Sequence, residues 1–115
     1  MHYDTIIGAR DLPRSGPPPD WVVIDCRFDL ADPAWGESAY HRGHIPGAFF
    51  AHLDKHLCGA VTRGTGRHPL PNWPRFAARL GQWGIRPTTQ VIVYDQHNGS
   101  YAARLWWMLR ALGHG

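Results

Sequence analysis

Short apolar runs alternate along the chain with amphipathic segments, and this alternation predicts the elements of the fold. Residues 21–26 and 91–94 are apolar at nearly every position. Such runs are typical of strands buried on both faces of a parallel sheet. Residues 45–50 predict a third, shorter strand that follows a turn at Pro46 and Gly47.

Three segments between and after these strands predict helices. The first begins at Asp32 and Pro33 and runs to about residues 40–42. The second is capped near Asn72 and ended by Gly84, and the third covers about residues 101–109 and stops at Gly113. Their expected packing residues are Phe76, Leu80 and Trp83 in the second helix, and Leu105, Met108, Leu109 and Leu112 in the third.

Strands and helices in this order predict an α/β fold, with helices flanking a parallel sheet, in one domain over residues 1–115. Residues 51–71 are rich in Gly, His and Arg and predict a long loop, a kind of segment that is often functional. A crossover helix normally returns the chain to a further strand, and no strand follows the last helix. We therefore expect the domain to be truncated before its last strand.

Composition limits the classes of function. Of 115 residues 43% are hydrophobic, which is enough for a core, and the net charge of +3 comes from scattered cations. This distribution favours a small anionic ligand or a solvated surface over nucleic acid. No apolar run approaches the roughly 18 residues of a membrane span, and the N-terminus lacks a signal-peptide pattern, so a cytoplasmic protein is expected. Two cysteines make no disulfide framework.

Asp95 occupies the most informative position, because it follows a buried strand and opens a Gly-containing loop that leads into a helix. The backbone N–H groups and the dipole of a helix start favour an anion at such a place. Enzymes that place a thiolate there use a cysteine with a lowered pKa. A carboxylate cannot carry sulfur, so the segment has the frame of a catalytic loop without its nucleophile.

Four segments together resemble the rhodanese family, and within it the N-terminal half of tandem-domain sulfurtransferases of the thiosulfate and 3-mercaptopyruvate type. The most specific is Gly43-His44-Ile45-Pro46-Gly47-Ala48, which is close to a signature of the family. The others are residues 24–27, with an Asp-x-Arg step, residues 93–104 around Asp95, and the helix end at residues 106–114.

The resemblance implies that the catalytic cysteine lies in a C-terminal rhodanese domain, joined covalently or acting in trans, and that the N-terminal half has Asp95 at the matching position. It also implies two auxiliary residues at the domain interface. Asp54 matches the position of an interface aspartate, and His68, in His68-Pro69-Leu70-Pro71, matches that of a histidine. The implied substrate is a small anionic sulfur donor. No cofactor, metal or membrane partner is expected.

Each of these residues also has a plain structural interpretation. Asp95 can accept N–H bonds at the helix start, and Asp54 and His68 can be ordinary loop residues. Cys26 is expected to be a small buried residue. Cys58, five residues before Arg63, resembles a phosphatase loop that is one residue short.

The remaining candidates are the histidine pairs, Arg104 and the tryptophan pair. The pairs His41/His44 and His52/His56 have helical spacing, but no ligand set is complete around them. A hydrogen bond within the turn is therefore expected for His44. Arg104 could reach an anion, but we expect it to pair with a carboxylate at the edge of the core, such as Asp25. One of Trp106 and Trp107 is expected to pack against a neighbouring strand or domain.

The leading hypothesis is a non-catalytic N-terminal domain of a sulfurtransferase. That enzyme would move sulfane sulfur from thiosulfate or 3-mercaptopyruvate to cyanide or a thiol through a cysteine persulfide of the partner domain. The alternative is a free-standing inactive module that binds or regulates a partner. A third possibility is a truncated product that folds poorly. Without a cysteine after Tyr94, the chain alone is expected to be inactive.

Overall fold

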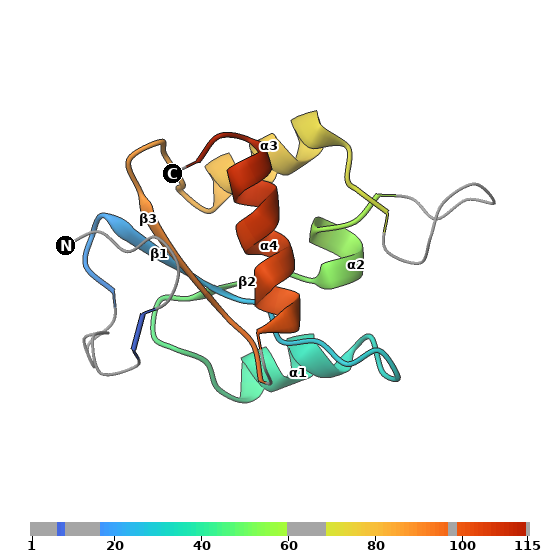
Figure 1. Cartoon of the computed structure of the whole chain (residues 1–115). Coiled ribbons are helices and arrows are strands. Elements are labelled where there is room, and N and C mark those ends of the chain that lie inside the picture. Colours follow the sequence, from blue (N-terminus) through green and yellow to red (C-terminus); the bar gives the residue numbers. More distant parts are fainter. Residues whose placement is uncertain (1–6, 9–16, 60–68, 97–98, 115) are drawn as a thin grey trace.

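Three parallel strands form the sheet in the computed structural model, which describes residues 7–8, 17–59, 69–96 and 99–114. Strand β1 (Trp21–Asp25) lies between β2 (Phe49–Phe50) and β3 (Gln90–Tyr94). The register pairs Asp25 with both Phe50 and Tyr94, so all three strands end at the same edge (Figure 1). The α/β class and the parallel sheet predicted from the apolar runs are confirmed.

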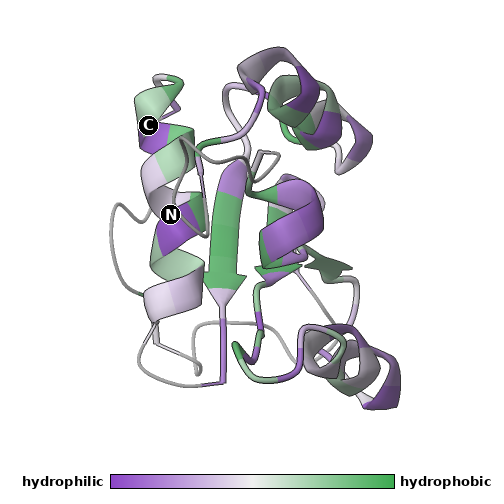
Figure 2. Ribbon diagram, turned by 90° about the vertical axis from the view of Figure 1, so that its right-hand side faces the viewer, coloured by the Kyte–Doolittle hydropathy of each residue, from purple (hydrophilic) through white to green (hydrophobic). Residues whose placement is uncertain are grey.

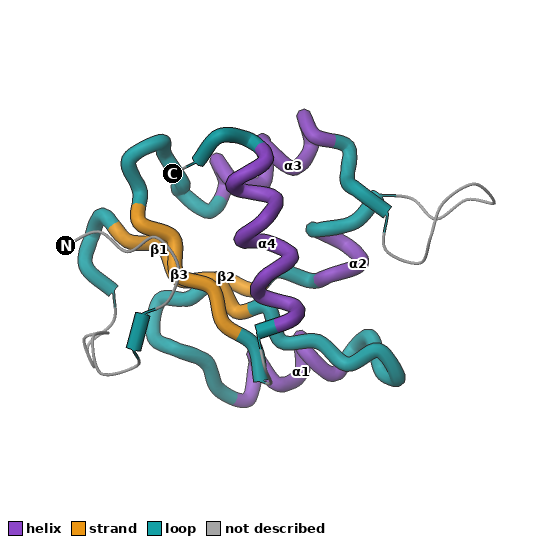
Figure 3. Tube along the Cα trace, in the orientation of Figure 1, coloured by secondary structure: helices purple, strands orange, loops and turns teal. Residues whose placement is uncertain are grey.

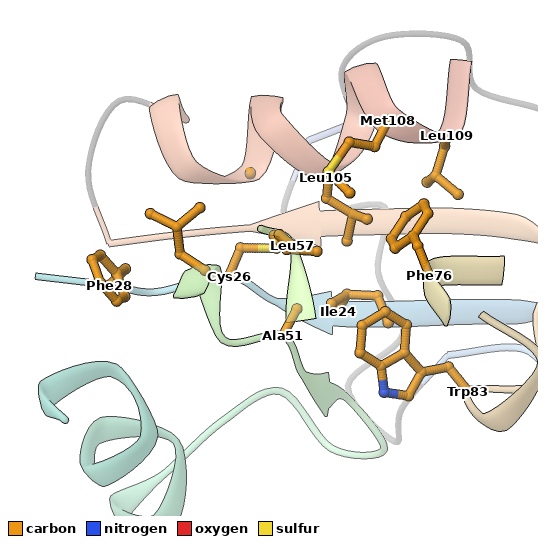
Figure 4. Packing of buried hydrophobic residues seen from close by; sticks show 12 residues of the cluster. Ile24, Cys26, Phe28, Ala51, Leu57, Phe76, Trp83, Leu105, Met108 and Leu109 are labelled. Atoms are coloured by element: carbon orange, nitrogen blue, oxygen red, sulfur yellow. The ribbon is translucent and has the colours of Figure 1, made fainter. Parts of the chain in front are cut away.

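Alternation along the strands gives each face of the sheet its own core. Val22, Ile24 and Cys26 pack toward α2 (Leu53–His56), α3 (Trp73–Gln82) and α4 (Ser100–Ala111). Val23 faces the other way and packs with Ala48 and Ile92. Helix α1 (Trp35–Arg42) lies on the side of the sheet away from α4 (Figures 1 and 4). Hydrophobic strands lie at the centre, and hydrophilic stretches are concentrated on the surrounding helices and loops (Figure 2).

The main core lies between α4 and the sheet. Leu105, Met108 and Leu109 point from α4 toward the strands and are at most 5% exposed, as their spacing predicted (Figure 4). Phe76 and Trp83 complete this cluster from α3 and from the position after it. Burying side chains of this size contributes about 1.5–3 kcal/mol each, which fixes α4 against the sheet.

The second helix begins as predicted, while the first does not. The side chain of Asn72 accepts a hydrogen bond from the backbone N–H of Arg75 and so caps α3. The chain at Asp32 instead forms a turn, in which the Asp32 carboxylate accepts from Ala34 N–H, and α1 begins only at Trp35. Gly36 explains this placement, because a Cβ atom there would lie 2.0 Å from the Arg27 carbonyl oxygen. The close approach of α1 to that backbone requires glycine.

Two further predictions are wrong. The expected loop over residues 51–71 contains the short helix α2, capped by His52. Leu112 is 43% exposed, because α4 ends at Ala111 before the next turn can reach the sheet. That one of Trp106 and Trp107 packs against a neighbouring strand or domain stays a prediction: both are exposed, and the Arg110 guanidinium lies over the Trp106 ring. Among the described residues, no helix is long and apolar enough to cross a membrane.

Candidate functional site

The carboxyl ends of the strands are the place where parallel α/β sheets bind ligands. Loops that follow β1 and β3 leave the sheet together at this edge (Figure 3). Gln96 joins them, because its side-chain amide donates to the Phe28 carbonyl oxygen at 2.6 Å and accepts from the Phe28 N–H at 3.3 Å. The backbone N–H of Cys26 also donates to the Tyr94 carbonyl oxygen. The candidate site therefore rests on a backbone that is held from both sides.

Asp95 occupies the anion cradle at the start of α4, which we define as the backbone N–H groups of Gly99, Tyr101 and Ala102. The Asp95 carboxylate accepts hydrogen bonds from these three groups at 3.1, 2.9 and 3.0 Å. Gly99 adopts a φ of 87°, which lets the loop turn its N–H groups toward the carboxylate. The structural interpretation of Asp95 is thus observed directly. The cradle already holds an anion, namely the side chain of its own loop.

A second carboxylate, Asp25, is completely buried and organises the opposite face of this edge. Arg27 binds it through two guanidinium nitrogens at 2.7–3.1 Å, and its backbone N–H also donates to it at 2.9 Å. The Tyr94 hydroxyl donates to the same carboxylate at 2.9 Å. Burial, together with the hydrogen bond to Asp25, raises the pKa of Tyr94 to about 12, so this hydroxyl remains a donor. The expected pairing of Asp25 with Arg104 is therefore wrong.

This Asp25 network also holds the turn that carries the family signature. The Arg27 guanidinium donates to the Gly43 carbonyl oxygen, and the Tyr94 hydroxyl accepts from Ile45 N–H. In the same turn, the His44 ring stacks on Tyr40 at 3.8 Å and lies 2.8 Å from the Tyr40 carbonyl oxygen. The prediction of a structural hydrogen bond for His44 is confirmed. The signature turn is thus a fixed support of the sheet edge.

Arg104 lies on α4 and reaches a different part of the chain. Its guanidinium donates to the carbonyl oxygens of Leu57 at 3.0 Å and Pro69 at 2.9 Å, and lies 3.6 Å from the Cys58 sulfur. The Gly59 N–H donates to the same Pro69 oxygen at 3.1 Å. These contacts bring the residue after α2 next to the segment that precedes α3. We call residues 57–59 with 69–70 the loop neck.

The two cysteines differ in surroundings, and neither environment favours a thiolate. Cys26 is 2% exposed within the main core, as expected, and burial raises the pKa of its thiol strongly. Cys58 is half-buried at the loop neck. Desolvation raises the pKa of the Cys58 thiol, while the positive charge of Arg104 lowers it and the negative charge of Asp54 raises it. Arg63 and most of the phosphatase-like segment lie outside the described residues.

Asp54 projects from α2 and is exposed. The helix that carries it is fixed at its N-terminus by His52, whose Nδ1 accepts from the backbone N–H groups of Asp54 and Lys55. The other ring nitrogen of His52 lies 3.0 Å from the Pro33 carbonyl oxygen and donates to it. This arrangement sets the tautomer of the His52 ring. His68, the other predicted auxiliary residue, lies outside the described residues.

His56 ends α2, and its Nδ1 accepts from the His52 N–H at 2.8 Å. Desolvation, together with the nearby positive charges of Arg79 and Lys55, lowers the pKa of His56 from 6.5 to about 4. In the unfolded chain His56 therefore takes up its proton at a higher pH than in the folded chain. Neither histidine pair belongs to a cluster of three or more metal-ligating side chains among the described residues.

We expect the free energy of unfolding to fall as pH falls from about 6.5 to about 4, because over this range the unfolded state binds one more proton at His56. Below about pH 4 His56 is protonated in both the folded and the unfolded state, so it no longer makes the free energy of unfolding depend on pH. The His56→Gln variant keeps an acceptor for the His52 N–H and should show a flatter pH dependence. Urea unfolding at several pH values measures the difference, and identical slopes for the two proteins would contradict the assignment.

The comparisons with known proteins agree with this architecture. The family profile described as a Rhodanese-like domain matches residues 10–115, so the chain belongs to the rhodanese-like family. It is 46% identical over 114 residues to a Pseudomonas aeruginosa protein named probable 3-mercaptopyruvate sulfurtransferase, covering 98% of this chain and 40% of that protein. An Arabidopsis thaliana thiosulfate/3-mercaptopyruvate sulfurtransferase is 43% identical over 107 residues, with 83% and 30% covered.

A solved structure shows the same fold. The 3-mercaptopyruvate sulfurtransferase from Leishmania major superposes with a TM-score of 0.78 at 33% identity, over 83% of this chain and 26% of that one. Family membership and the resemblance stated from the motifs are thereby confirmed. The chain spans two fifths or less of the length of these relatives.

Sequence reasoning missed two residues that build the site. Gln96 follows β3 as an ordinary polar loop residue, and only the folded chain shows that it bonds to Phe28, 68 residues away. Tyr94 was counted as a strand residue, although its hydroxyl joins Asp25 to the signature turn. The one signal available was the alternation of β3, which places Tyr94 on the same face as Asp25.

Proposed function

We propose that this chain is the non-catalytic N-terminal rhodanese domain of a sulfurtransferase whose catalytic cysteine belongs to a partner rhodanese domain. One observation carries the proposal: the Asp95 carboxylate fills the cradle at the position where the resemblance would place a thiolate. A carboxylate held by three N–H groups neither attacks sulfur nor leaves room for an anionic donor. The names of the relatives support the sulfurtransferase class.

The proposed reaction divides the work between two domains. The partner thiolate attacks the outer sulfur of thiosulfate or the thiol sulfur of 3-mercaptopyruvate. The S–S bond of thiosulfate breaks to release sulfite, or the C–S bond of 3-mercaptopyruvate breaks to release the enolate of pyruvate, which takes up a proton. Cyanide or a thiol then attacks the outer sulfur of the cysteine persulfide and regenerates the thiolate. Asp54, exposed on α2, would stand at the domain interface and orient a proton on the donor, together with His68.

The purified chain should show negligible formation of thiocyanate from thiosulfate or 3-mercaptopyruvate and cyanide. A chimera in which it replaces the matching segment of the 46% identical Pseudomonas aeruginosa protein should be active, because that protein supplies the remaining length. Serine in place of the cysteine nucleophile of the chimera is the control for background.

Rapid thiocyanate formation by the chain alone, lost in Cys58→Ser, would refute the proposal. A chimera that folds but is inactive would favour the alternative of a free-standing binding or regulatory module. Circular dichroism of the chimera separates that outcome from simple failure to fold.

A further inference from the structure

The loop neck joins three segments that are distant in sequence, and Arg104 is the side chain that touches both sides of it. It bonds to the Leu57 carbonyl oxygen on one side and to the Pro69 carbonyl oxygen on the other. Both bonds come from one guanidinium nitrogen, Nη2, whose two N–H groups have fixed directions in the guanidinium plane, so the two carbonyl groups are held at a set spacing. The backbone of α4 at Arg104 is fixed, because the next residue of the helix, Leu105, is fully buried in the main core.

We call the contacts of Arg104 with the Leu57 and Pro69 carbonyl oxygens the clamp. Close packing of the backbone also holds the two sides of the neck together. The Gly59 N–H donates to Pro69, and a Cβ atom at Gly59 would lie 2.6 Å from the Leu70 carbonyl oxygen. A carbonyl oxygen of the backbone cannot move aside as a flexible side chain can. The two sides of the neck therefore meet at a spacing that glycine at position 59 allows and that the Arg104 Nη2 group bridges.

The clamp acts directly on the element that carries Asp54. Helix α2 has only four residues, and its last backbone contact, from Leu57 N–H to the Leu53 carbonyl oxygen, lies beside the carbonyl held by Arg104. His52 fixes the other end of α2 through Pro33. The Arg104 guanidinium lies 3.6 Å from the Cys58 sulfur, directly after the Leu57 carbonyl group at the end of this helix.

We propose that Arg104 is a positioning residue for the sulfur-donor half of the reaction: by clamping Leu57 and Pro69 it sets where α2 presents Asp54. This inference rests on the proposed function, since it assumes that Asp54 meets the donor. Arg104 contacts backbone rather than substrate. Its loss should therefore impair donor use while the cysteine persulfide, once formed in the partner domain, reacts normally.

Two measurements test the proposal. In the 115-residue chain, Arg104→Met should speed hydrogen exchange of the Gly59 amide at least about tenfold, because the neck opens without global unfolding, and the Ile24 amide in β1 should report unchanged global stability. In the active chimera, the same change should lower kcat/KM for the donor about tenfold and leave kcat/KM for cyanide unchanged. For both the Gly59 exchange rate and kcat/KM for the donor, Arg104→Lys should give values between those of the unsubstituted protein and of Arg104→Met.

Arg110→Met is the matched control, because it removes the same kind of side chain from the exposed side of α4 and should change neither quantity. Gly59→Ala, which forces the neck apart with Arg104 intact, should reproduce the loss of donor use. Unchanged Gly59 exchange in Arg104→Met would overturn the clamp. Equal losses for donor and cyanide would overturn the positioning role. An inactive parent chimera overturns the proposed function, whereas Gly59 exchange still decides whether Arg104 holds the neck.

Discussion

Replacing Asp25 by asparagine should lower the free energy of unfolding by about 3 kcal/mol, among the largest losses available to a single substitution in this chain. The carboxylate is completely buried and accepts from the backbone and guanidinium of Arg27 and from the Tyr94 hydroxyl. An amide carries no charge and offers a single acceptor oxygen, so the Arg27 guanidinium would remain largely buried without its counter-ion. Urea unfolding followed by tryptophan fluorescence measures the loss.

Asp20→Asn provides the control, because it makes the same chemical change at an exposed position directly before β1. We expect a change within about 0.5 kcal/mol for it. Tyr94→Phe, which removes one hydrogen bond to Asp25, should cost about 1–2 kcal/mol. Equal losses for Asp25→Asn and Asp20→Asn would show that the network does not stabilise the fold.

The Asp95→Ala variant should lose about 2 kcal/mol of folding free energy and gain a dependence on inorganic anions that the native chain lacks. Three backbone N–H groups at the start of α4 lose their acceptor, as when a helix N-cap is removed. Because these groups converge on one point at the positive end of a helix, sulfate can take the place of the carboxylate. Replacing chloride by sulfate at constant ionic strength should then recover part of the loss.

Asp32→Ala separates this effect from a general response to sulfate. Its carboxylate accepts from the single N–H of Ala34, and its removal should cost less than about 1 kcal/mol without a specific gain from sulfate. Asp95→Asn keeps an acceptor but no charge. Its free energy of unfolding and its gain from sulfate should lie between those of the native chain and of Asp95→Ala. Parallel stabilisation of all variants by sulfate would contradict an anion cradle at Gly99, Tyr101 and Ala102.

The fold could be predicted to a large extent because local patterns and burial agree in this chain. Apolar runs marked β1 and β3, and Asn72 with Pro74 marked the start of α3. The position of Asp95 after a strand and before a helix was enough to predict an occupied anion cradle. These features depend on residues within about seven positions of one another, so the sequence order itself shows them.

Features that depend on distant contacts could not be read in this way. Arg104 was assigned to Asp25 by charge, yet it bonds to carbonyl oxygens 47 and 35 residues away. The start of α1 is set by the backbone of Arg27 against Gly36, a contact that no helix-capping pattern reports. Helix α2 is too short to show periodicity, and His52 is an uncommon N-cap residue. Every residue has a backbone carbonyl group, so the sequence does not show which of these groups accepts a hydrogen bond from a distant side chain.

The loop neck has a consequence for how such proteins can diverge. Gly59 and Pro69 are hydrogen-bonded to each other, so the two ends of the segment between them are held together at one point. Lengthening a segment closed in this way adds only loop-closure entropy, about 0.6 kcal/mol for each doubling of its length. Insertions and deletions between residues 60 and 67, which leave His68 in place, can therefore accumulate without moving α2 or α3. The neck makes this segment a place where evolution, or a protein engineer, can change chain length while the rest of the domain keeps its geometry.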